Sequence, residues 1–302
     1  MADAALLLPD FLLIVLGWLL CRHTALNRPL WDAVERLVYH LLFPGLLFHA
    51  ILRHPLQIGE VGALAACALG VMLSGVALAF AVGLWPGVDR RLYASGQQTA
   101  FRFNSYVALA LSERLAGTAG LAWMGLILAL CVPVANVAAV WPLARHGGRG
   151  TMRELARNPL IIATLAGLAA SLAGLKLPDV ASTVVSRIGA AALPLGLMAV
   201  GAGLHFGALR ESPRLATALM LIRHLALPAV ALAMVTAAGL PPAQQAVVVA
   251  FAALPTASSA YVLAVRMGGH GPFVAGLITV STLASMVGLP AALSALRWVS
   301  PP

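Results

Sequence analysis

Two interruptions decide how this chain folds: FRFNSY at residues 101–106 and ALPTASSAY at residues 253–261. Each lies in the fourth of five apolar segments, and one set of five stands on either side of a basic loop near the middle of the chain. Because each half has an odd number of spans, the second half must be inverted relative to the first. Inverted repeats with a matched pair of interrupted helices are the best sequence indicator of a secondary transporter with a midplane binding site.

The composition indicates a membrane protein with several spans. Of the 302 residues, 61% are hydrophobic and 10% are charged, with a mean hydropathy of +0.94, whereas soluble domains carry roughly 25% charged residues. The net charge of +9 comes from arginines in short loops, which the positive-inside rule explains without a nucleic-acid partner. Cys21, Cys67 and Cys131 have neither zinc nor disulfide spacing, and no metal or cofactor is expected.

Ten transmembrane helices are predicted, in an all-α protein built from two five-helix repeats. The repeats cover residues 1–144 and 159–302, and a short basic cytoplasmic loop at 145–158 joins them. The predicted spans are approximately residues 5–21, 36–53, 60–84, 97–112, 117–143, 159–176, 184–205, 215–240, 245–265 and 273–297.

Charged residues set the predicted orientation. The chain starts with Asp3 and Asp10 rather than a basic region, so the first segment is expected to be retained and to start outside. With ten spans, more basic residues then fall inside than outside, as the positive-inside rule requires. The inside set is Arg22, Arg28, Arg36, Arg90, Arg91, Arg145, Arg149, Arg153, Arg157, Arg210, Arg214 and Arg266, and the outside set is Arg53, Arg114, Lys176, Arg187 and Arg297. Both termini are therefore expected outside the inner membrane, on the periplasmic or extracellular face.

The first interruption supplies the sharpest site candidates. An arginine in mid-span costs about 2.5–3.5 kcal/mol on insertion scales, so Arg102 is expected to face a cavity or the protein interior. Its guanidinium fork matches a carboxylate in two parallel hydrogen bonds, which favours an anionic substrate. The alternative is that Arg102 reaches the inner interface or caps a carbonyl. Asn104, followed by Ser105 and Tyr106, is expected to line a polar cavity, because an unpaired amide is costly in hydrocarbon.

The second interruption offers helix ends and hydroxyls. Pro255 removes a backbone donor and is expected to break the helix, and Thr256, Ser258 and Ser259 follow it. Free N–H groups at the ends of a broken helix can hold an anion, although serines also pack between helices with no functional role. Further candidates in the fifth spans are Asn136 and Thr282, with Thr279, Ser281 and Ser285; Arg223 and His224 are expected to have a structural or interfacial role.

Several short motifs, in order, resemble the auxin efflux carrier family, whose bacterial members include malate and malonate permeases. The motifs are FPGLLF at 43–48, RFN at 102–104, PVAN at 133–136, NPLIIA at 158–163, LPLGL at 193–197, ALP at 253–255 and VSTLAS at 280–285. The resemblance implies a fold like that of sodium–bile acid symporters, in which broken fourth and ninth helices cross. Helices one, two, six and seven would form a scaffold past which the others move like an elevator. It also implies a homodimer, as in plant members.

One departure from the family concerns the first interruption. Many relatives have a proline soon after the fourth-span motif, whereas residues 106–111 contain none. The first crossing helix is therefore expected to be broken less sharply, or its break depends on Asn104 and Ser105 alone.

The sequence thus predicts a membrane carrier that moves a small organic anion of the carboxylate class by alternating access. The alternative is a sodium- or proton-coupled symporter on the same fold, although no carboxylate lies at mid-membrane to bind the ion. A membrane enzyme would need clustered catalytic groups, and His40, His49 and His54 form no such pattern. A receptor that senses a solute without transport is the third alternative.

Overall fold

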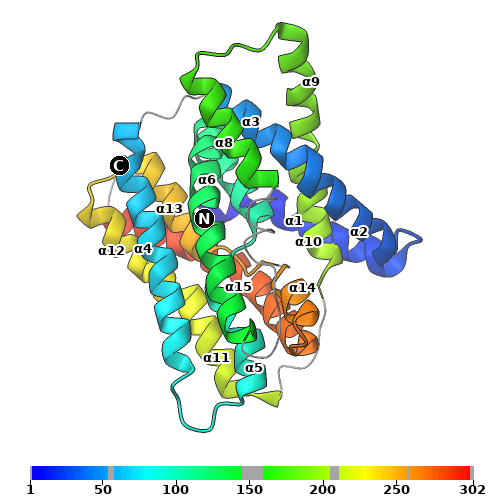
Figure 1. Ribbon diagram of the computed structural model, residues 1–302, viewed down its shortest axis with the longest axis vertical. Coiled ribbons are helices and arrows are strands. Elements are labelled where there is room, and N and C mark those ends of the chain that lie inside the picture. The colour runs from blue at the N-terminus through cyan, green and yellow to red at the C-terminus, as the bar shows by residue number, and fades with distance from the viewer. Residues whose placement is uncertain (1, 54–57, 145–158, 205–210, 258, 300–302) are drawn as a thin grey trace.

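The computed structural model describes residues 2–53, 58–144, 159–204, 211–257 and 259–299. Within these ranges the chain is helical and has no strand (Figure 1). The long helices α4 (Ile58–Val82) and α6 (Ser105–Ala144) pack together along the longest axis of the molecule. The other elements are α1 (Ala2–His23), α2 (Arg28–Leu37), η1 (Val38–Leu42), α3 (Phe43–Arg53), α5 (Arg90–Gly96), η2 (Gln97–Ala100), α8 (Pro159–Leu172), α9 (Asp179–Ala190), α10 (Ala192–Ala202), α11 (Pro213–Leu221), η4 (Ile222–Ala226), α12 (Leu227–Ala237), α13 (Pro242–Ala253), α14 (Ser259–Arg266) and α15 (Gly271–Val299).

Six helical runs among the described residues are long and apolar enough to cross a membrane. They are Arg28–Arg53, Val61–Val82, Arg90–Leu143, Asp179–Ala202, Pro213–Ala237 and Gly271–Val299, and shorter apolar helices lie at Leu12–His23, Ile162–Leu172 and Pro242–Ala253. Each predicted span overlaps one of these runs, and the predicted fourth and fifth spans share Arg90–Leu143. The prediction of an all-helical, multi-pass membrane protein is confirmed, whereas ten membrane crossings stay a prediction. The predicted loop at 145–158 lies outside the described residues.

Large apolar side chains are exposed on the outer surface of several helices. Soluble monomers rarely expose contiguous apolar patches larger than a few hundred Å², and lipid is the solvent that suits such a surface. Exposed examples are Leu12, Leu16, Leu73, Trp141, Ile162, Leu165, Leu221, Leu225, Leu283 and Val287.

Prolines and one glycine account for the irregular turns. Pro44 and Pro228 lack the N–H group that an α-helix needs, and each follows a π-helical turn, η1 or η4. In α6, Ala116 and Gly117 depart from helical geometry, and Gly117 has a φ of 57°. This turn coincides with the predicted start of the fifth span at residue 117, so α6 consists of two helices that meet at residues 116–117.

Small residues allow close contacts between helices from the two halves of the chain. Helix α1 packs against α10, and α8 packs against α3. Gly17 lies against the backbone of Met198, and Gly201 lies against the carbonyl oxygen of Ile14. The hydrophobic effect does not drive helices together inside lipid, so they associate through such close backbone packing. These glycines are therefore expected to hold the two halves together.

Gly201→Ala is expected to lower the apparent Tm of the purified protein. The added Cβ would collide with the Ile14 carbonyl, and overpacking costs about 1–3 kcal/mol. Gly62→Ala on α4 is the matched control, because a Cβ there meets no atom within 4 Å. Thermal melts with size-exclusion chromatography as the readout should show a lower Tm for Gly201→Ala than for Gly62→Ala. Equal Tm values would contradict the close α1–α10 contact.

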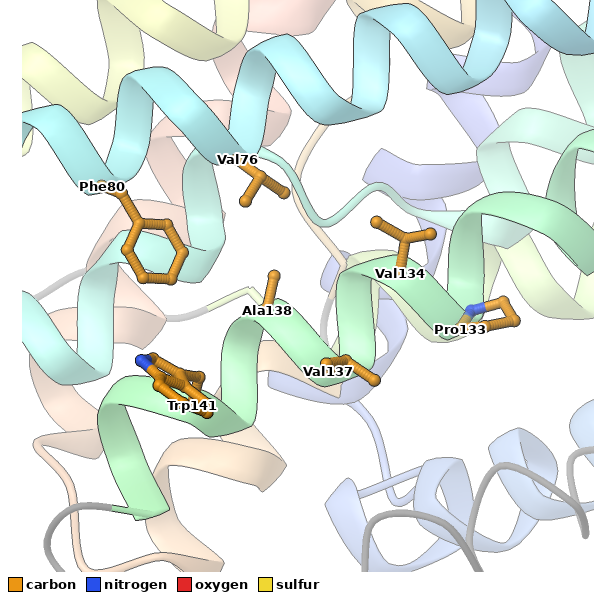
Figure 2. Close-up of a pocket in the computed structure, with 7 residues that line it drawn as sticks. All are labelled: Val76, Phe80, Pro133, Val134, Val137, Ala138 and Trp141. Carbon is orange, nitrogen blue, oxygen red and sulfur yellow. The ribbon is translucent and has the colours of Figure 1, made fainter.

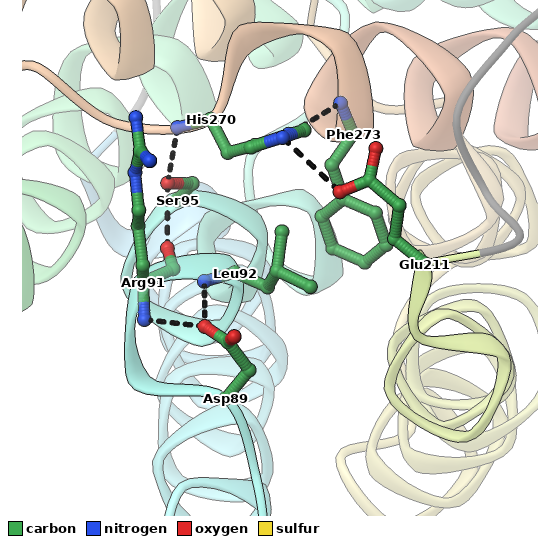
Figure 3. Close-up of polar contacts among 7 residues, drawn as sticks. All are labelled: Asp89, Arg91, Leu92, Ser95, Glu211, His270 and Phe273. Carbon is green, nitrogen blue, oxygen red and sulfur yellow. Dashed lines mark hydrogen bonds and ion pairs between the residues drawn. The ribbon is translucent and has the colours of Figure 1, made fainter.

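Polar contacts cap the start of α5 and tie its last turn to the loop before α15 (Figure 3). Asp89 Oδ1 accepts hydrogen bonds from the first N–H groups of α5, and Ser95 Oγ accepts one from the His270 N–H at 2.8 Å. His270 Nδ1 accepts from the Phe273 N–H, so Nε2 carries the proton that faces the Glu211 carboxylate at 3.1 Å. These bonds fix the beginning of the first interrupted segment against α15.

Candidate functional site

The first interruption is a true break in the helix. Helix α5 continues into η2, which ends at Ala100; residues 101–104 are not helical, and α6 begins at Ser105. Asn104, which is only 3% exposed, caps the new helix: its Oδ1 accepts from the Tyr106 N–H at 3.0 Å and the Val107 N–H at 3.3 Å. The missing proline is therefore replaced by an asparagine cap, which is one of the two possibilities the sequence left open.

The second interruption follows from Pro255. Helix α13 ends at Ala253, and Leu254 is extended, with φ −58° and ψ 149°, as expected for a residue before proline. Residues 254–257 are not helical, and α14 begins at Ser259. Ser258, one of the predicted hydroxyls, lies outside the described residues.

The two breaks are in direct contact. The Asn104 N–H donates to the Pro255 carbonyl at 2.9 Å, and the Thr256 hydroxyl donates to the Thr99 carbonyl at 2.7 Å. The rings of Phe103 and Phe251 pack edge to face beside this contact, with centroids 4.7 Å apart. Broken helices at membrane depth require partners for their freed backbone groups, and here each break supplies partners for the other.

Arg102 and Asn136, predicted separately, lie together. Arg102 Nη2 donates to Asn136 Oδ1 at 2.6 Å and Nη1 donates to Gln98 Oε1 at 3.0 Å. Gln98 is buried and also donates to the carbonyls of Ser95 and Ala260, so it connects η2 to α14. The half-buried guanidinium is thus held at the first break by side chains from η2 and α6.

A second polar chain reaches the break from α15. The Thr256 N–H donates to Ser281 Oγ at 2.9 Å, and His224 Nε2 lies 2.9 Å from the same oxygen. Thr282, the predicted candidate, instead donates to the Ile278 carbonyl of its own helix. Ser281 is therefore the α15 hydroxyl that contacts the second break.

The remaining candidates lie around the contact rather than within it. Tyr106 stacks on Phe43 of α3, with ring centroids 4.9 Å apart. Ser105 is half-buried at the start of α6, and Ser259 is exposed at the start of α14. These side chains flank the breaks on the side where α6 and α14 begin.

Arg223 belongs to the site although the sequence placed it only in a structural or interfacial role. It is 1% exposed and donates to the carbonyls of Leu254 at 2.6 Å and Phe251 at 3.3 Å. The sequence signal that could have identified Arg223 is its position well inside an apolar span. Gln98 was missed as well, and its signal is the polar run at residues 97–99, one helical turn before Arg102.

Two surface grooves are lined by residues outside the two breaks. One, of about 510 Å³, runs between α4 and α6 and is lined only by apolar side chains (Figure 2). The other, of about 410 Å³, runs between α11 and α15 and includes His224. Apolar grooves that face outward suit lipid chains better than an anion. The contact between the breaks is instead enclosed, with Asn104, Thr256 and Ser281 all buried.

Comparison with known proteins indicates a membrane transport protein. Residues 120–293 match a family model described as "Membrane transport protein". A protein of Rhizobium meliloti (strain 1021) named "Putative malonate transporter" is 25% identical over 306 residues, which cover 97% of this chain and 95% of that protein. The family match includes the second break and Asn136, and the similarity to the Rhizobium meliloti protein extends over nearly the whole chain.

Proposed function

This chain belongs to the membrane transport protein family, as its resemblance to auxin efflux carriers predicted, and we propose that it is a secondary carrier for a small carboxylate. The observation that carries the proposal is the hydrogen-bonded contact between two broken helices beside a half-buried arginine. Arg102 would bind the substrate carboxylate, and the N–H groups at the starts of α6 and α14 would add positive potential.

The substrate is proposed to be a small dicarboxylate. The Rhizobium meliloti relative is named for malonate, which has two carboxylates on one carbon. Arg102 bonds directly to Asn136 and stands two residues before Asn104, which caps the start of α6, so these groups are proposed to bind one carboxylate. The hydroxyls of Ser105 and Ser259 are accessible donors that would complete the polar surroundings.

Ten spans in two inverted repeats, residues 1–144 and 159–302, are proposed to form the carrier. Reciprocal packing supports this proposal. The first helix of each repeat contacts the C-terminal part of the second span of the other repeat: α1 packs on α10, and α8 packs on α3. The breaks also contact each other as equivalent elements would. Because the contact is enclosed, substrate entry requires movement, which supports alternating access; the elevator type is proposed from the resemblance to the auxin efflux carriers. Both termini are proposed to lie on the outer face of the inner membrane. The carrier is also proposed to form a homodimer.

Malonate is expected to raise the apparent Tm of the detergent-purified protein, whereas malonamide, its neutral isostere, is not. A ligand at 100 times its Kd stabilises the folded state by about 2.7 kcal/mol, which corresponds to a Tm shift of roughly 4 °C for a chain of 302 residues. Other mono- and dicarboxylates should then be screened, and the best binders tested for uptake into proteoliposomes. If no carboxylate shifts the Tm more than its amide, the proposed substrate class is wrong.

A further inference from the structure

Arg223 has an environment that is unusual for a charged side chain in a membrane protein. Its guanidinium is fully buried and bonded to two backbone carbonyls, those of Leu254 and Phe251. Among the residues that the structure describes, no acidic side chain forms an ion pair with it. A buried cation without an anion is costly, so the two carbonyl oxygens must supply most of its stabilisation.

Pro255 ends the regular helical bonding of these carbonyls, and the Phe251 carbonyl retains a longer backbone bond, from the Leu254 N–H at 3.4 Å. The N–H group of residue 255 would bond to the Phe251 carbonyl in a continuous helix, but proline has none. The Leu254 carbonyl is left beyond the end of α13, where the chain is extended. The last carbonyls of a helix carry partial negative charge, so the end of α13 forms a small cage for a cation, and Arg223 fills it.

Ion-coupled carriers bind a sodium ion or a proton with the backbone carbonyls of unwound segments and with helix C-terminal ends of this kind. We propose that the Arg223 guanidinium is a tethered cation that occupies this position permanently. The second break, and the carboxylate site that the proposed function places beside it, are then assembled without a bound sodium ion. This assignment deepens the proposed function, because it selects the sodium-independent carrier over the sodium-coupled alternative.

The geometry also makes Arg223 a positioning residue for the first break. Arg223 holds Leu254, the adjacent Pro255 carbonyl accepts the Asn104 N–H, and Asn104 caps α6. On the same π-helical turn, His224 contacts Ser281, which accepts the Thr256 N–H. Two neighbouring side chains of η4 therefore fix the backbone on both sides of Pro255.

Chemical rescue of a truncated side chain tests the proposal without any transport assay. Arg223→Ala empties the cage, and its apparent Tm is expected to fall on the order of 10 °C. Guanidinium chloride at low millimolar concentration should restore roughly half of that loss, compared with choline chloride at equal ionic strength. Arg223→Met keeps the volume filled and is expected to lose stability without rescue. Arg214→Ala removes an exposed arginine at the start of α11 and serves as the control.

The outcomes separate this proposal from the carrier function. Equal responses of Arg223→Ala to guanidinium and choline would overturn the tethered cation, and so would a saturable sodium-induced Tm shift in the wild-type protein. If Arg223→Ala cannot be purified, Arg223→Lys decides: its retained charge should make it melt above Arg223→Met, and equal melting would overturn the proposal. The malonate-induced shift of the wild type, measured in parallel, reports on the carrier function alone.

Discussion

Arg102→Met is expected to abolish the malonate-induced Tm shift and to lower proteoliposome uptake by about 100-fold or more. Truncating one partner of a desolvated charge pair costs about 2–5 kcal/mol, and every 1.4 kcal/mol is about tenfold in affinity. Arg102→Lys is expected to lose less, because it keeps the charge but cannot form two parallel bonds to a carboxylate. Affinity should be measured on the monodisperse fraction, so that loss of folded protein is not counted as loss of binding.

Arg91→Met is the matched control for Arg102→Met. Arg91 is an exposed arginine in the same helical run, at the start of α5, and it lies away from the breaks. Its substitution should leave the malonate shift unchanged. If Arg102→Met lowers the Tm but keeps the wild-type malonate affinity, Arg102 only bridges Gln98 and Asn136 and does not bind substrate. That structural role differs from the interfacial position or carbonyl cap that the sequence left open.

The breaks were predictable because their causes are local. Pro255 removes a backbone donor wherever it stands in a helix, and a polar run in an apolar segment marks backbone that needs partners. The same reasoning anticipated Asn104 in a buried polar setting. The sequence could not show that Asn104 would act as a cap, because Ser105 was equally available, and only the backbone geometry distinguishes the two.

The directions in which the side chains point could not be predicted from the sequence. Ser281 and Thr282 are neighbours on α15, about 100° apart around the helix, so a small error in helix rotation exchanges them. Arg223 lies in a π-helical turn, which rotates the residues that follow relative to a regular helix. Its contact with α13 depends on that turn and on the packing of two distant spans, neither of which is written in the local pattern.

Asn104→Ala is expected to lower the apparent Tm and to eliminate malonate uptake. The substitution leaves the N–H groups of Tyr106 and Val107 without their acceptor in a buried setting, and loss of a cap costs about 0.5–2 kcal/mol. Asn104→Ser offers another capping oxygen without charge, so it should retain most of the stability and a measurable part of the uptake. Thermal melts and uptake assays on the wild type, Asn104→Ala and Asn104→Ser check these expectations.

Asn104→Asp separates capping from substrate binding. An aspartate caps a helix as well as an asparagine, and its negative charge is favoured at a helix N-terminus. Because residue 104 is only 3% exposed, burial of that charge is costly, so the variant should melt below the wild type, and its uptake should be measured on the folded fraction. The same charge would lie where the substrate carboxylate is proposed to bind and would repel it, so malonate uptake should be lost. Uptake by Asn104→Asp equal to that of Asn104→Ser would mean that the start of α6 supports the fold but does not bind the anion.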